Sequence, residues 1–246
     1  MLNRRRFCWY CLLVLPHLPA YAAAKVLRLV YAQDYPPYST QLNGKPSGIE
    51  IDIADEIFGR RFGFSVQHEI LPWARAQLMV ENGSADALFA TPSRQRLTYA
   101  SASKEAVVRW NVSMYVRKDD HRLDLVRSLD QLTPFKIAVL HGNSWAMNKL
   151  TGLRVEYVPN QIALPRMLIA GRFDVVLEDS YVMMHLLKKD GSDVYITELP
   201  HELDSADIHL MLSLKSTQQD LLARFDKEIK LMREDGSLTN LIAKYR

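Results

Sequence analysis

The stretch Gly171-Arg-Phe-Asp-Val-Val-Leu-Glu-Asp179 decides the class of the fold. Its central run, 173–177, is typical of a short buried strand, and the helical pattern of 180–188 follows it directly. A strand that passes into a helix is the building unit of layered α/β proteins. The last residues of the stretch therefore stand at the carboxyl end of a strand, where α/β proteins bind their ligands.

Strand patterns alternate with helix patterns on both sides of this stretch. The further predicted strands cover 26–31, 64–71, 86–90, 136–140, 154–158, 193–197 and 209–215. The further predicted helices cover 51–62, 73–81, 160–170 and a long segment from 221, with two more starting at Ser144 and Ser237. This order predicts an α/β protein.

Composition and charge exclude several classes of protein. Of the 246 residues, 48% are apolar and 24% are charged, which excludes a disordered chain, a collagen and a coiled coil. The formal net charge of +3 equals the contribution of Arg4, Arg5 and Arg6, so residues 25–246 carry balanced charges. A nucleic-acid partner is not expected, because nucleic-acid binders keep a basic surplus in their folded part.

Residues 1–24 have the pattern of a cleaved signal peptide. Three arginines at 4–6 precede an apolar run at 7–15, and small residues around Ala22 offer cleavage sites. The apolar run is too short to span a membrane. The arginines suit either a general or a twin-arginine export route, and this choice stays open. Since Cys8 and Cys11 both lie in this segment, the exported chain has no thiol, and we expect it in the periplasm.

Motifs of common enzyme chemistry are missing from the sequence. There is no glycine-rich phosphate loop, no Gly-x-Ser-x-Gly and no His-Glu-x-x-His. Ser101-Ala-Ser-Lys104 fits a nucleophile pattern, but the motifs that accompany that pattern are absent. The acids Glu50, Asp52, Asp55 and Glu56 are interpreted as complements to the dipole of a helix start. We therefore expect no catalytic residue, no metal site and no cofactor.

Binding-type residues instead recur at the predicted loops between strands and helices. In chain order the main stretches are Tyr31-Ala-Gln-Asp-Tyr-Pro-Pro-Tyr38, Pro72-Trp-Ala-Arg75, Ser93-Arg-Gln-Arg96, Val139-Leu-His-Gly-Asn-Ser144 and 171–179. Taken together, they resemble the family 3 bacterial solute-binding proteins, the periplasmic receptors for polar amino acids, over essentially all of 25–246.

The resemblance implies the two-lobed periplasmic-binding-protein fold with two hinge crossings, which closes on its ligand. One lobe would comprise 25–108 plus 208–246, and the inserted lobe would comprise 112–207. The crossings would lie near 108–111 and 206–209.

The resemblance also implies roles for four residues of the first half of the chain. Tyr35 and Trp73 match the aromatic residues that sandwich the ligand side chain. Arg96 matches the arginine that binds the ligand α-carboxylate, a task that suits the planar guanidinium, and Thr91 matches a second carboxylate contact. Because the segment before Arg96 is slightly short for the family, Arg94 competes with Arg96 for this role, and Arg96 is favoured.

Three residues of the second half complete the implied site. Asn143 and Ser144 stand at a helix start, where backbone N–H groups would meet the carboxylate. Asp179 matches the acid that pairs with the ligand α-ammonium. The segment Ala102-Ser-Lys-Glu-Ala106 departs from the family pattern, so that wall of the cleft is not assigned.

The predicted function is therefore that of a non-enzymatic, monomeric receptor in the periplasm. It would capture a small polar solute, with an amino acid as the expected ligand, for an inner-membrane ABC permease. One alternative is an enzyme of the same fold, dehydratase-like, with Glu178 or His141 as the candidate acid or base. The other is a sensory module that acts in trans on a membrane kinase, and the fold alone does not decide among the three.

Overall fold

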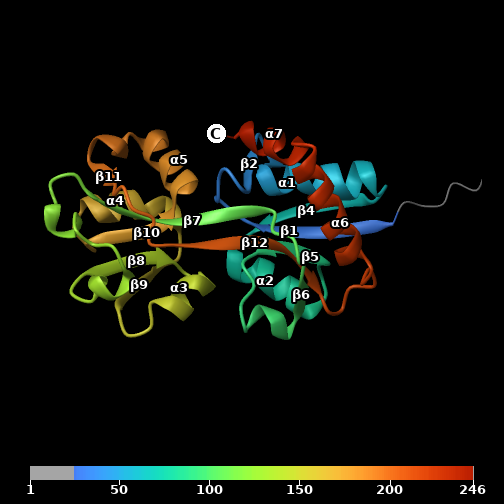
Figure 1. Ribbon diagram of the computed structural model, residues 1–246, viewed down its shortest axis with the longest axis horizontal. Helices are drawn as coiled ribbons and strands as arrows, with labels where there is room; N and C mark the ends of the chain where they lie inside the picture. Colours follow the sequence, from blue (N-terminus) through green and yellow to red (C-terminus); the bar gives the residue numbers. More distant parts are fainter. Residues whose placement is uncertain (1–24, 246) are drawn as a thin grey trace, which may run out of the picture.

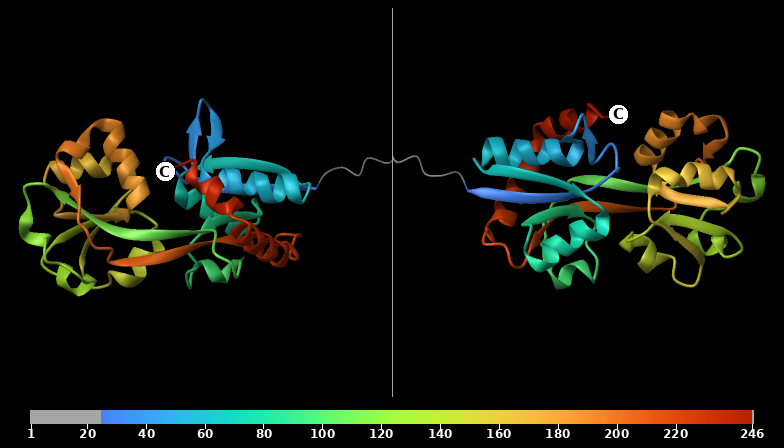
Figure 2. Two further views of the ribbon diagram at one scale, coloured as in Figure 1. Left: turned by 45° about the horizontal axis from the view of Figure 1, so that its top comes forward. Right: turned by 180° about the vertical axis from the view of Figure 1, so that it is seen from behind.

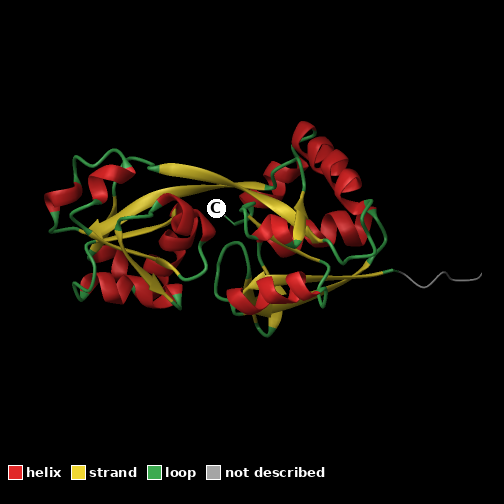
Figure 3. Ribbon diagram, turned by 90° about the horizontal axis from the view of Figure 1, so that it is seen from below, coloured by secondary structure: helices red, strands yellow, loops and turns green. Residues whose placement is uncertain are grey.

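The computed structural model describes residues 25–245, so the expected signal peptide at 1–24 lies outside the described residues. Two lobes lie side by side, joined by two long strands, β7 (Val108–Arg117) and β12 (Asp204–Ser213) (Figures 1 and 2). These strands pair antiparallel from Ile208 opposite Val108 to Asp204 opposite Val112. Figure 3 shows both strands running from one lobe to the other. The predicted α/β class with two lobes and two crossings is confirmed.

Below, the first lobe denotes 25–108 plus 208–245 and the second lobe denotes 112–207, which are the bounds expected from the resemblance within the described residues. The sheet of the first lobe has the order β4-β1-β5-β12, in which β1 (Val26–Ala32) pairs in parallel with β4 (Ser65–Leu71) and with β5 (Ala87–Ala90). The short β6 (Ala100–Ala102) pairs with β12, and β2 (Thr40–Leu42) forms a separate hairpin with β3 (Lys45–Ser47).

Helices cover the sheet of the first lobe on both faces. They are α1 (Ile49–Ala54) with its π-helical continuation η1 (Asp55–Arg61), α2 (Trp73–Asn82), the short turn η2 (Arg96–Thr98), α6 (Leu221–Glu234) and α7 (Ser237–Ala243). The apolar face of α6 is buried as its pattern predicts, and Phe225 stacks on Phe58 of η1 with ring centroids 5.6 Å apart. This contact packs α6 against η1, in the N-terminal half of the same lobe.

The second lobe continues the sheet in the order β7-β10-β8-β9. Every residue of β10 (Val175–Asp179) is buried. This strand lies between antiparallel β7 and parallel β8 (Lys136–Leu140). On the far side of β8, β9 (Arg154–Val158) pairs in parallel with it, and β11 (Ile196–Glu198) pairs with β7. The helices are α3 (Ser144–Lys149), α4 (Leu164–Ile169) and α5 (Ser180–Asp190). Single 3-10 turns complete the lobe: η3 (His121–Leu123), η4 (Leu129–Leu132), η5 (Gln161–Ala163) and η6 (Ser192–Val194).

Most predicted elements are present, and the differences have local causes. The helix predicted over 160–170 is split into η5 and α4, with Pro165 in the first turn of α4. The predicted strand at 209–215 begins earlier, at Asp204, because its first half pairs with β7. The hairpin of β2 and β3 was not predicted. Among the helices of 25–245, none combines the length and the apolar character that a membrane crossing requires.

Gly48 connects β3 to the start of α1. Its φ of +135° lies in a region that side chains rarely adopt, and a Cβ there would overlap the carbonyl oxygen of Tyr38. The tight turn lets the N–H of Ile49 donate to Pro37 O at 2.9 Å and the N–H of Glu50 donate to Tyr38 O at 3.0 Å. Gly48 therefore determines where Glu50 lies.

We predict that Gly48→Ala lowers the free energy of unfolding by at least about 2 kcal/mol, because the backbone must leave a glycine-only conformation and clear the Tyr38 carbonyl. The measurement is urea unfolding followed by circular dichroism. Gly44→Ala is the control, since Gly44 also has a positive φ, +74°, but faces open space. Equal losses for the two variants would contradict this account of Gly48.

Candidate functional site

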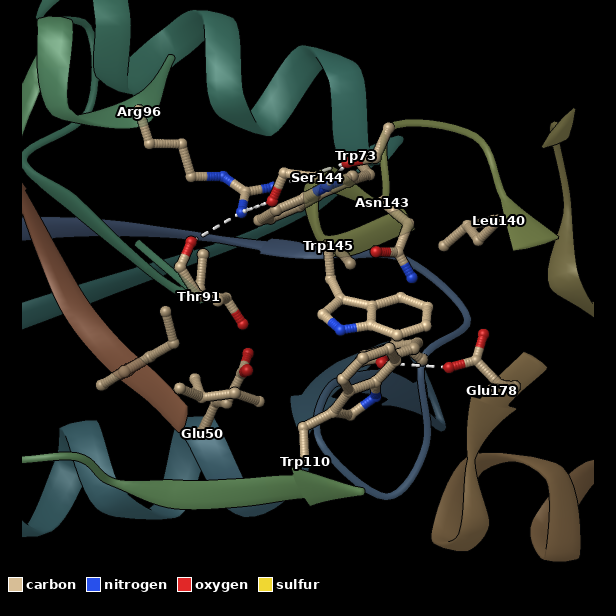
Figure 4. A pocket seen from close by; sticks show the side chains of 16 residues that line it. Glu50, Trp73, Thr91, Arg96, Trp110, Leu140, Asn143, Ser144, Trp145 and Glu178 are labelled. Carbon is tan, nitrogen blue, oxygen red and sulfur yellow. Dashed lines mark hydrogen bonds between the residues drawn. The ribbon is translucent and has the colours of Figure 1, made fainter. Parts of the chain in front are cut away.

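A cavity lies between the two lobes, at the ends of strands from both of them (Figure 4). It holds about 670 Å³ of empty space, part of which is open to solvent. The first lobe lines it with residues that include Glu50, Trp73 and Arg96, and the second lobe lines it with residues that include Ser144 and Glu178. A ligand in this cavity therefore touches both lobes.

Arg96 is the buried cation of the cavity, only 4% exposed. Its Nε donates to Gln77 Oε1 at 3.0 Å, and its Nη1 donates to Thr91 O at 2.7 Å and to Ser144 Oγ at 2.6 Å. Its Nη2 donates to Gly142 O at 3.5 Å, so the guanidinium reaches from the first lobe to the second. All these acceptors are neutral, and no carboxylate of 25–245 lies within ion-pair distance of Arg96.

The surroundings of Arg96 favour an anionic ligand. Burial lowers the pKa of Arg96, since a low-dielectric environment penalises the charged form. A buried charge is expensive until an opposite charge neutralises it. The cavity therefore offers a preformed place for an anionic group, with a planar donor that suits a carboxylate.

Aromatic side chains form much of the remaining wall. The indole of Trp73, at the start of α2, lies against Arg96, whose Cζ is 5.2 Å from the ring centroid, and its Nε1 donates to Gly142 O at 3.3 Å. Trp110 on β7 meets Trp145 on α3 edge to face, with centroids 5.8 Å apart. Tyr35 stacks on Tyr38 at 5.4 Å. These flat surfaces suit the side chain of a ligand or a cationic group.

Two glutamates complete the polar part of the wall. Glu178 Oε1 accepts hydrogen bonds from Asp179 N at 2.9 Å and from the Tyr35 hydroxyl at 3.4 Å, while Oε2 is buried without a hydrogen-bond partner. Glu50, from α1, makes no side-chain hydrogen bond or ion pair within 25–245, and Figure 4 shows its carboxyl group pointing into the cavity. Burial raises the pKa of each glutamate to about 8.

Asp179 caps a helix, whereas the neighbouring Glu178 lines the cavity. The Asp179 carboxylate accepts hydrogen bonds from Tyr181 N at 3.0 Å, Val182 N at 3.2 Å and Asn111 N at 3.2 Å, so it caps α5 and also ties α5 to β7. The side chain is fully buried, and burial raises its pKa to about 6 while these N–H groups oppose the shift. Asp179 is not among the residues that line the cavity.

The structure thus brings six of the seven expected site residues to one cavity: Tyr35, Trp73, Thr91, Arg96, Asn143 and Ser144. Asp179 stands one residue away from the lining residue Glu178. Arg94 is exposed and is not a lining residue, and the same holds for His141. Among residues 25–245, no group of three His, Cys, Asp or Glu side chains could hold a metal ion.

Sequence reasoning missed Glu50, Trp110 and Trp145 as lining residues, and it considered the lining residue Glu178 only as the candidate acid or base of the alternative enzyme. Glu50 does stand in the first turn of α1, as the dipole interpretation requires, but its side chain also faces the cavity. For the two tryptophans a weak signal was present, because Trp110 lies on a predicted crossing and Trp145 follows Ser144.

Comparisons with known proteins agree with the geometry. Residues 27–246 match the family described as bacterial extracellular solute-binding proteins, family 3. Comparison with curated proteins finds no match.

Among solved structures, a histidine kinase sensor domain with similarity to periplasmic binding proteins has a TM-score of 0.79 at 18% identity, covering 90% of this chain and 96% of that chain. An ancestral arginine-binding protein bound to arginine has a TM-score of 0.75 at 21% identity, covering 89% and 97%. The substrate-binding protein of an amino acid ABC transporter has 0.72 at 19%, covering 89% and 98%. These similarities show the fold, which is the predicted periplasmic-binding-protein fold.

We predict that Asp179→Ala lowers the free energy of unfolding by about 1–2 kcal/mol, because three backbone N–H groups lose their acceptor and α5 loses its cap. Asp179→Asn keeps one oxygen acceptor and should lose less. Chemical denaturation measures both. The exposed Asp193, in the same lobe, is the control, and Asp193→Ala should change stability by less than about 0.5 kcal/mol. An unchanged stability of Asp179→Ala would mean that the cap is energetically unimportant.

Proposed function

The chain belongs to the family 3 bacterial extracellular solute-binding proteins, and from this premise we propose that it captures an amino acid for an ABC transporter. The observation that carries the proposal is the buried Arg96 guanidinium, which lines the cavity with no carboxylate partner in 25–245. A ligand α-carboxylate would supply the missing negative charge. Thr91, Asn143 and Ser144 lie beside it and would complete the contacts to that group.

The acidic corner at the end of β10 would hold the ligand α-ammonium. Glu178 presents a buried oxygen without a partner there, while the carboxylate of the adjacent Asp179 is engaged by backbone N–H groups. We therefore assign the direct contact to Glu178, with Asp179 adding negative charge behind it. Tyr35, which donates to Glu178, and Trp73 would flank the side chain of the ligand.

Membership of the family also supports a proposal for the cellular location of the protein and for its partners. Family members are extracellular proteins that bind small solutes and work with ABC transporters. For this chain we propose export to the periplasm with removal of 1–24, action as a monomer, and delivery of the solute to an inner-membrane permease. Because Arg96 of the first lobe contacts Ser144 of the second, a ligand bound between them would favour the closed arrangement of the lobes.

An enzyme of the same fold is the second candidate function. The observation that favours it is Glu178, a cavity carboxyl with a pKa near 8, which could hold and release a proton near neutral pH. Product analysis after incubation with each bound amino acid tests it, and unaltered ligand supports the receptor. A sensory module that acts in trans would bind its ligand at the same site, but its partner would be a membrane kinase and not a permease.

We predict that Arg96→Ala weakens the binding of the amino acid that the wild type binds by about 30- to 3,000-fold, measured by titration calorimetry. Removing one partner of a desolvated charge pair typically costs about 2–5 kcal/mol, and about 1.4 kcal/mol corresponds to tenfold. Arg94→Ala is the control and should bind normally, since Arg94 is exposed. If Arg94→Ala loses binding while Arg96→Ala keeps it, the carboxylate is held elsewhere.

A further inference from the structure

Glu50 is a buried acid that takes no part in the contacts proposed above for the carboxylate and the α-ammonium of an amino acid. It is 5% exposed, it lines the cavity, and its side chain forms no hydrogen bond or ion pair with any residue of 25–245. The Gly48 turn fixes the backbone of Glu50 at the start of α1, where its N–H donates to Tyr38 O. Figure 4 shows the Glu50 carboxyl group aimed into the cavity, apart from Glu178.

No cationic side chain of 25–245 forms an ion pair with Glu50, and burial alone accounts for its raised pKa. Glu50 in turn contributes, after burial, to the raised pKa of three tyrosines: Tyr31 on β1, and Tyr35 and Tyr38 in the loop after it. All three tyrosines have a raised pKa and are neutral at physiological pH. The guanidinium of Arg96 is held by the acceptors described above and forms no ion pair with Glu50.

The cavity wall therefore holds more acidic than basic groups. One buried cation, Arg96, faces two buried carboxyl groups, Glu50 and Glu178. An amino acid with a neutral side chain carries one carboxylate and one ammonium, which would match Arg96 and Glu178 and leave Glu50 unmatched. Without a counter-charge, burial holds the Glu50 carboxyl group largely in its neutral form, and a second cationic group of the ligand would supply the counter-charge that its ionised form lacks.

We propose that Glu50 determines specificity by binding a second cationic group, so that the ligand is a basic amino acid or a compound with the same charges. This inference rests on the proposed function. The ligand carboxylate then lies at Arg96, its α-ammonium at Glu178 and its cationic side-chain end at Glu50. The tryptophan walls add to the preference, since an ammonium or guanidinium is attracted to the face of an indole ring.

Binding of such a ligand should release protons. The pKa of Glu50 near 8 means that the carboxyl group is largely protonated at pH 7, while a neighbouring cation favours the ionised form and lowers the pKa. Affinity for a basic ligand should therefore rise as the pH increases from 6 to 8, up to about tenfold per pH unit for each proton released. Glu178 has a similar pKa and would contribute as well.

The test compares three probes, L-arginine, L-glutamine and L-glutamate, by titration calorimetry on the wild-type chain and on Glu50→Gln. We expect the wild type to prefer L-arginine. Glu50→Gln should weaken L-arginine binding at least about 30-fold and change L-glutamine binding less than about threefold. A merely structural role of Glu50 would weaken both probes equally. Asp52→Asn, on the same helix but outside the cavity, is the matched control.

A second readout separates charge from shape. Titrations in buffers with different ionisation enthalpies count the protons released, and Glu50→Gln should release fewer than the wild type. The inference is overturned if the wild type prefers L-glutamine or L-glutamate, or if Glu50→Gln weakens all probes alike. If none of the twenty L-α-amino acids binds, the proposed function itself fails.

Discussion

A positive charge buried between two lobes is the constraint on which the rest of the site depends. The guanidinium of Arg96 is held by neutral acceptors from both lobes, Gln77 and Thr91 on one side and Ser144 and Gly142 on the other. These contacts fix its orientation without neutralising its charge. The cavity is therefore prepared for an anion before any other selection acts, and closing the lobes removes the water that would otherwise screen that charge.

The topology explains how such distant segments meet. Thr91 follows β5, Gly142 and Ser144 follow β8, and Glu178 is the last residue but one of β10, so each residue stands at or just after the carboxyl end of a strand. The crossing strands β7 and β12 run between the two lobes (Figure 3), and residues at these strand ends of both lobes line one cavity. Ligands of open α/β sheets bind at this place. The motifs that carry the family resemblance therefore lie where the fold places the cavity, because both depend on the carboxyl ends of the strands.

Much of this arrangement could be predicted from the sequence, because proline, glycine and capping signals mark where strands end and place Trp73, Arg96 and Ser144 there. What could not be predicted is the direction of individual side chains. Neighbouring residues of a strand point to opposite faces, so only the packing of β10 decides that Glu178 faces the cavity while Asp179 caps α5. Likewise, the position of Glu50 in the first turn of a helix suggests only an interaction with the helix dipole, and the sequence does not show that its side chain faces the cavity.

The most direct measurement uses the tryptophans of the cavity. The sequence has four tryptophans, of which Trp9 lies in 1–24 and the other three, Trp73, Trp110 and Trp145, all line the cavity. Their fluorescence is to be titrated with L-α-amino acids and, in parallel, with the methyl esters, which lack the carboxylate. The account predicts a saturable change with at least one amino acid and none with its ester. Equal binding of acid and ester would contradict the role of Arg96.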